Sequence, residues 1–128
     1  MLLDSTFLHD LVRGESAAIE RLDELIEERT DVAVSTLTVF EVGAGLRGNA
    51  ERYREQYDET LDEVSTLPFG TPEARSAVRI QHALLDRGER IGAVDVLIAG
   101  TAIAHSIPVL TRNVEEFERV EGLTVATY

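Results

Sequence analysis

The chain has 128 residues and a formal net charge of -12, because 24 Asp and Glu residues outnumber 12 basic residues that are all Arg. The sequence contains no Cys and no Lys, which excludes thiol nucleophiles, disulfides, zinc ribbons, Schiff-base chemistry and a P-loop lysine. Its length predicts a single domain over residues 1–128, and the lack of a long apolar run or a basic leader predicts a cytoplasmic protein without membrane contact.

The excess of acid bears on the class of partner. Affinity for nucleic acid comes mainly from Lys and Arg that neutralise phosphates, so a net charge of -12 argues against such a partner. The same composition is expected of a protein in a saline cytoplasm, since about 1 M salt shortens the Debye length to about 3 Å and weakens repulsion between surface acids. The acidic surface is therefore predicted to be of the halophilic type.

The N-terminal half predicts short apolar strands that alternate with helices. Residues 1–4 are a short apolar run that predicts a strand, and a helix is expected to begin at Asp4 or Ser5. Residues 16–29 carry apolar side chains at helical spacing, and a strand is expected over 32–34. A helix then runs from Thr36 to Gly48, and its apolar neighbours predict that Glu41 has little access to solvent.

The C-terminal half continues this alternation. Thr71 and Pro72 predict the cap and first residue of a helix that Gly88 ends. The residues of this helix expected to face inward are Val78, Gln81, Leu84 and Leu85. Asp95 is expected to start a helix that is apolar on nearly all sides and buried among several neighbours. The other expected elements are a helix over 50–66 and strands over 67–70, 107–110 and 123–126. Short apolar strands between helices predict an α/β fold, a three-layer α/β/α sandwich around a short parallel sheet.

Several acids are expected at one edge of this sheet. Ligands of open parallel sheets bind beyond the carboxyl ends of the strands, where Asp4 and the segment 111–116 lie. Glu41 and Asp95 belong to helices that begin near the same edge. Clustered carboxylates repel one another unless a cation is present, and Mg²⁺ or Mn²⁺ prefers oxygen ligands. Taken singly, Asp4 and Asp95 are equally well explained as helix caps.

Four short motifs together resemble the PIN domain family, specifically the VapC-like toxins of type II toxin–antitoxin systems. The motifs occur in family order and with family-like spacing across essentially the whole chain. They are Leu3-Asp4-Ser5-Thr6, the stretch from Ser35 to Val42 followed by Gly45, the block from Asp95 to Ala102, and the block from Leu110 to Phe117.

The resemblance implies that clustered acids hold Mg²⁺ or Mn²⁺ and cut RNA. Asp4, Glu41 and Asp95 match the first three acids of the family. Many members carry Asp where Asn113 stands here, and another subset has Asn there with an acid three residues on, which matches Glu116. The expected second shell and substrate contacts are Thr6, Thr111, Asn113, Arg112 and Arg47.

The implied function is a metal-dependent endoribonuclease that is paired with a small antitoxin and forms a homodimer. The sequence leaves open a nuclease-like fold that binds or regulates without turnover, because the fourth acidic position departs from the commoner pattern. A haloacid-type phosphohydrolase also places Asp after its first strand. That enzyme needs a second Asp two residues later, where Thr6 stands here, and usually a Lys.

Overall fold

The computed structural model describes all 128 residues. They form a five-stranded sheet of order β3-β2-β1-β4-β5 in which every neighbouring pair is parallel. The strands are β1 (Leu2–Leu3), β2 (Ala33–Ser35), β3 (Ser65–Leu67), β4 (Val109–Leu110) and β5 (Val125–Ala126). The helices are α1 (Ser5–Val12), α2 (Ser16–Glu27), α3 (Thr36–Ala44), the 3₁₀-helix η1 (Gly48–Tyr53), α4 (Arg54–Glu63), α5 (Thr71–Asp86), α6 (Ala93–His105) and α7 (Val114–Phe117).

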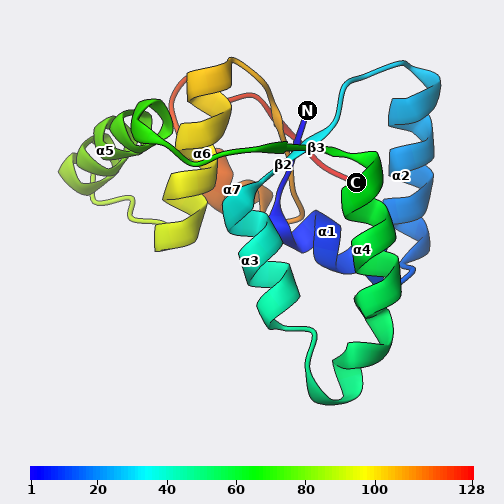
Figure 1. Cartoon of the computed structure of the whole chain (residues 1–128). Helices are drawn as coiled ribbons and strands as arrows, with labels where there is room; N and C mark the ends of the chain where they lie inside the picture. Colours follow the sequence, from blue (N-terminus) through cyan, green and yellow to red (C-terminus); the bar gives the residue numbers. More distant parts are fainter.

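The helices cover both faces of the sheet (Figure 1). Successive strand residues point to opposite faces, so Leu2 and Val109 pack in one core with α5, α6 and α7. Leu3 and Leu110 pack in a second core with α1, α2 and α3. The predicted parallel α/β/α arrangement is confirmed. None of the helices combines the length and apolarity that a membrane crossing requires.

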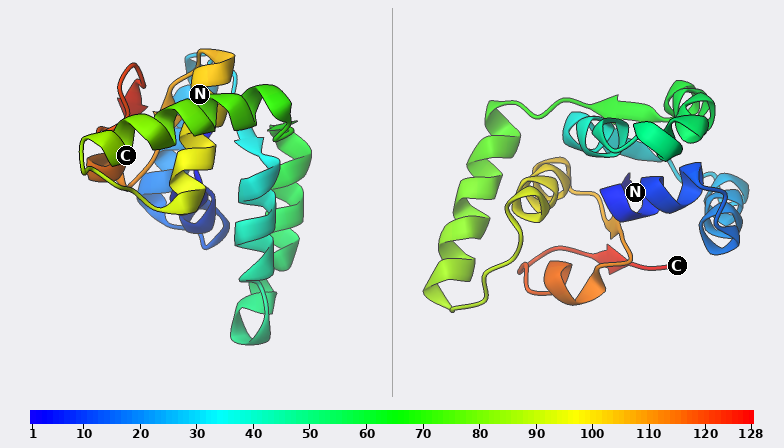
Figure 2. Two further views of the ribbon diagram at one scale, coloured as in Figure 1. Left: turned by 90° about the vertical axis from the view of Figure 1, so that its left-hand side faces the viewer. Right: turned by 90° about the horizontal axis from the view of Figure 1, so that it is seen from below.

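Helix α6 lies between α5 and the sheet, as the right-hand view of Figure 2 shows. The contact with α5 is close because α6 has no side chain at Gly100. A Cβ atom built there would stand 2.8 Å from both Cβ and the backbone nitrogen of Ala77. Glycine therefore allows the two helix backbones to meet, and this contact sets the position of α6 and of the acid it carries.

Some predicted boundaries are wrong, and Val78 and Leu85, which are expected to face inward, are exposed. Helix α6 begins at Ala93 after the N-cap Gly92, so Asp95 lies inside the first turn and does not cap it. Helix α5 is capped by Gly70, whose N–H donates to Oε2 of Glu73 at 3.2 Å, because Thr71 already has helical backbone angles. The segment predicted as one helix over 50–66 divides into η1 and α4.

Candidate active site

Asp4 lies directly after β1 and is almost fully buried, with 2% of its surface exposed. Its Oδ1 accepts hydrogen bonds from the backbone N–H of Phe7 at 3.0 Å and from Oγ1 of Thr6 at 2.7 Å. Its Oδ2 accepts from Oγ1 of Thr111, which follows β4, at 2.5 Å. Asp4 therefore caps α1 as predicted, and two hydroxyl groups also fix the direction of its carboxylate.

Burial raises the pKa of Asp4 above its usual value, since the carboxylate has lost most of its water. Hydrogen bonds from Thr111 and Thr6 stabilise the charged form and offset part of this effect. The two hydroxyl donors thus hold the carboxylate of Asp4 in one orientation, as an oxygen ligand. They recover only part of the solvation free energy that this carboxylate loses on burial.

Asn113 joins two further carboxylates. Its Nδ2 donates to Oδ2 of Asp95 at 3.1 Å and to Oε2 of Glu116 at 3.0 Å. Burial, followed by the hydrogen bond and the charge of Glu116 and by the charges of Asp4 and Glu41, raises the pKa of Asp95 to about 7. The hydrogen bonds with Asp95 and Asn113 lower the pKa of Glu116. The four acids predicted to cluster therefore lie close enough to influence one another.

Glu41 is exposed, so the prediction that it has little access to solvent is wrong. Helix α3 buries Thr38 and Val42 against the domain, and Glu41 lies beside this buried face, at the edge that faces Ser5. Its Oε1 accepts a hydrogen bond from Oγ of Ser5, at the start of α1, at 2.5 Å. This contact holds Glu41 toward the end of β1, where Asp4 lies.

The two predicted arginines differ in their surroundings. The backbone N–H of Arg112 donates to Oγ1 of Thr6 at 3.1 Å, and its guanidinium Nη1 donates to Oδ2 of Asp10 at 2.8 Å. Arg47 lies in the linker between α3 and η1, and its side chain forms no ion pair. The structure therefore brings Arg112, but not Arg47, into the hydrogen-bond network around Asp4.

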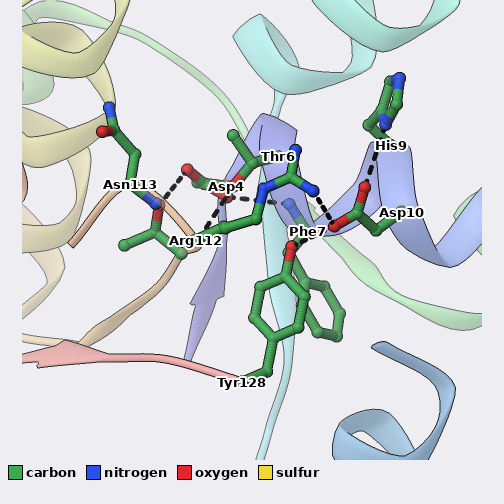
Figure 3. A network of polar contacts seen from close by, with 9 residues as sticks. Asp4, Thr6, Phe7, His9, Asp10, Arg112, Asn113 and Tyr128 are labelled. Carbon is green, nitrogen blue, oxygen red and sulfur yellow. Dashed lines mark hydrogen bonds and ion pairs between the residues drawn. The ribbon is translucent and has the colours of Figure 1, made fainter. Parts of the chain in front are cut away.

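No local sequence pattern marks Asp10, the carboxylate that anchors Arg112. Asp10 is 5% exposed and also accepts from the hydroxyl of Tyr128 at 2.7 Å and contacts Nδ1 of His9 at 3.2 Å (Figure 3). Burial opposes ionisation of Asp10, but the hydrogen bonds from Tyr128 and His9 outweigh it and lower the pKa of this carboxyl. Asp10 therefore remains a buried negative charge that holds Arg112 in place.

The site offers carboxylate and amide oxygens and neither a Cys nor a His ligand, which suits a hard divalent cation. No three acidic or histidine side chains are arranged to ligate one ion together. This is compatible with Mg²⁺, which usually retains several waters and takes only one or two protein carboxylates. Burial and repulsion from the neighbouring acids raise the pKa of Asp95, and a bound cation would offset both by stabilising the charged carboxylate.

Comparisons of the sequence with protein families and with curated proteins agree with one another. The family model described as "PIN domain" matches residues 1–123. Ribonuclease VapC19 of Mycobacterium tuberculosis is 36% identical over 116 residues, which cover 91% of this chain and 90% of that protein. Ribonuclease VapC1 of Rickettsia felis is 46% identical over 61 residues, and the matched part covers 48% of this chain and 46% of that protein.

Solved structures share the fold. VapBC2 of Rickettsia felis, crystallised with a DNA fragment from its promoter, superposes with a TM-score of 0.90 at 22% identity and covers 99% of this chain and 97% of that chain. VapBC-5 of Mycobacterium tuberculosis, a member of a family of toxin–antitoxin systems, superposes with a TM-score of 0.71 at 22% identity, covering 98% and 94%.

Proposed function

Because the chain belongs to the PIN domain family, we propose that it is a divalent-metal-dependent endoribonuclease and the toxin of a type II toxin–antitoxin pair. The proposal agrees with the ribonuclease names of its relatives. The observation that supports it most strongly is that acids from separate segments meet, since Asn113 donates to both Asp95 and Glu116. Burial, then Glu116, and then the charges of Asp4 and Glu41 raise the pKa of Asp95. Such mutual repulsion among acids is typical of sites that hold cations and process phosphate esters.

The residues have separable tasks in this proposal. Asp4 and Asp95 are the direct ligands, and Thr6 and Thr111 fix the carboxylate of Asp4. The chemistry that a bound divalent cation supplies is a lowered pKa of the attacking water and neutralisation of charge on the phosphate. In this proposal Glu41, which is exposed and accepts a hydrogen bond from Ser5, orients the attacking water and accepts its proton.

Glu116 and Asn113 share the fourth position. The Asn113 amide holds the carboxylates of Asp95 and Glu116 together without adding a further negative charge. The acid is then supplied by Glu116 one helical turn later, on α7. The chain thereby has four acids near the site even though Asn stands where many members of the family carry Asp.

The direct test measures cleavage of a single-stranded RNA with Mg²⁺ or Mn²⁺ and then with excess EDTA. We expect cleavage to fall at least about 100-fold in EDTA, because charge stabilisation of this kind contributes several kcal/mol. Restoring the metal should restore the rate. The Asp4→Asn variant, purified in the same way, reports any contaminating nuclease. Metal binding without cleavage by the wild type would instead favour a binding module that lacks turnover.

Substituting Asn113 by Asp tests why the chain carries an amide at this position. The new carboxylate would face Asp95 and Glu116 and replace the two donated hydrogen bonds with repulsion. We expect the metal-free protein to lose on the order of 1 kcal/mol of stability and to gain more from added Mn²⁺ than the wild type does. Thermal melts with and without Mn²⁺ measure both effects. An unchanged melting temperature in EDTA would contradict this role for Asn113.

The partner proposals rest on exposed apolar side chains. On α2, Ile19 is 41% exposed and Ile26 is 60% exposed, which leaves an apolar stripe for the antitoxin. On α5, Val78 and Leu85 are 53% and 49% exposed, although the sequence pattern places them inward. This second surface is assigned to the homodimer, since an apolar side chain left in water gains from burial against a copy.

A further inference from the structure

A polar cavity of about 260 Å³ opens beside the acid cluster, between α1, α3 and the segment that follows β4. Ser5, Thr6 and Glu41 line it and also belong to the candidate active site. The other polar side chains in its wall are His9, Arg13 and Arg112. The cavity is therefore continuous with the place where the proposed reaction occurs.

The charge of this cavity is opposite to that of the chain. Two of the 12 Arg side chains, Arg13 and Arg112, line it, and Glu41 is the one carboxylate in its wall. Since acids outnumber basic residues twofold in the whole sequence, such a lining favours an anion. Two cavities beside α5 are also lined by two arginines each, but this cavity is the one that shares residues with the candidate active site.

The cationic groups are held in advance by contacts outside the cavity. Asp10 holds Arg112 at 2.8 Å and contacts Nδ1 of His9 at 3.2 Å, so Nε2 of His9 is left for a ligand. The side chain of Arg112 remains 60% exposed, and one guanidinium N–H bond to Asp10 leaves further donors. The guanidinium of Arg13 lies 5.0 Å from the ring centroid of Tyr53, which limits its freedom.

We propose that this cavity binds a phosphate of the RNA strand next to the one that is cleaved, with Arg13, Arg112 and His9 as the contacting residues. The inference rests on the proposed function. The cavity supplies a cationic contact that positions the RNA strand while the acid cluster receives the reacting phosphate. An acidic nuclease needs such a contact because its acids repel the phosphates of the strand. These residues are positioning residues, so their loss should weaken substrate binding more than turnover.

The test compares Arg13→Gln with Arg52→Gln. Arg52 stacks on the same Tyr53 ring at 4.8 Å but does not line the cavity, so it is a matched control for loss of a guanidinium at that ring. Binding of a fluorescent single-stranded RNA in EDTA gives Kd and its salt dependence, and cleavage with Mn²⁺ gives kcat and KM. We expect Arg13→Gln to raise Kd and KM about five- to tenfold, with kcat within about twofold of wild type.

Loss of one phosphate contact should also reduce the slope of log Kd against log salt by about 0.7. Arg13→Lys should retain most of the binding, whereas Arg52→Gln should match the wild type. His9→Gln removes a second contact of the same cavity without touching Tyr53, and it should weaken binding in the same direction. Thermal melts identify any variant whose effect comes from misfolding.

Two results would overturn the proposal separately from the proposed function. If the wild type cleaves RNA and both Arg13→Gln and His9→Gln bind it with unchanged Kd and slope, the cavity is not a phosphate site. If Arg52→Gln weakens binding as much as Arg13→Gln, the loss of affinity reflects the loss of one positive charge anywhere on this surface, and the cavity is not a specific phosphate site. A wild type that neither binds nor cleaves RNA removes the proposed function and this subsite together.

Discussion

Substituting Asp95 by Asn is expected to lower kcat for RNA cleavage by about 10²- to 10³-fold while leaving the fold intact. The amide keeps the size of the side chain but removes the negative charge that the proposed cation contacts. Burial and the charges of Glu116, Asp4 and Glu41 already disfavour ionisation of Asp95. The variant should therefore melt at the same or a higher temperature than the wild type in EDTA, since one member of a repelling group has become neutral.

Three measurements check this result, namely cleavage rate, Mn²⁺ binding by calorimetry and the melting temperature in EDTA. Glu115→Gln is the matched control, because Glu115 lies on the same short helix as Glu116 but is exposed. It should cleave RNA and bind Mn²⁺ as the wild type does. A kcat for Asp95→Asn within about threefold of wild type would show that Asp95 takes no part in the reaction.

Substituting Gly100 by Ala is expected to destabilise the protein by about 2 kcal/mol, which lowers the melting temperature by roughly 8 °C. Ala favours a helix by about 1 kcal/mol over Gly, but here that gain is smaller than the cost of the clash. The added Cβ would stand 2.8 Å from the backbone nitrogen of Ala77 and 2.9 Å from its Cα. Because these are backbone atoms, α5 and α6 must separate to admit it.

Gly45→Ala is the control for this prediction. Gly45 ends α3 with φ of −79°, and a Cβ there would make an ordinary contact of 3.5 Å with the carbonyl of Val42. This variant should remain within about 0.5 kcal/mol of wild type in chemical or thermal unfolding. Gly100→Ala should also lower activity, since α6 carries Asp95 one and a half turns earlier. If the Gly100→Ala protein is as stable as the Gly45→Ala protein, α5 and α6 separate at no measurable cost, and the prediction is wrong.

The sequence predicted most of the fold because its information is local. The apolar strands and amphipathic helices were each visible in a short window, and the capping of α1 by Asp4 followed from its place after a strand. The start of α6 was misplaced because Gly92 and Asp95 are both acceptable caps, and the choice between them depends on packing. The same holds for Val78, which fits an apolar stripe of α5 but lies outside the core.

The candidate site was predicted less completely, because its contacts join distant parts of the chain. The hydrogen bond from Tyr128 to Asp10 spans 118 positions, and that from Arg112 spans 102. No periodic pattern marks Asp10 as a partner of either residue. Glu41 was expected to be buried from its apolar neighbours, whereas the structure turns α3 so that Val42 is buried and Glu41 is not. Contacts between distant segments therefore determine which side chains of the site are buried, and the local sequence pattern does not contain this information.

The position of β1 between β2 and β4 has a consequence for synthesis of the chain on the ribosome. Asp4 is made before its hydroxyl partner Thr111, which lies 107 positions later. At about 5–20 residues per second, several seconds pass before that partner emerges. A nascent chain consequently lacks the assembled acid cluster until Thr111 and Asn113 have been made, so cleavage at this site cannot begin while the earlier segments are being synthesised.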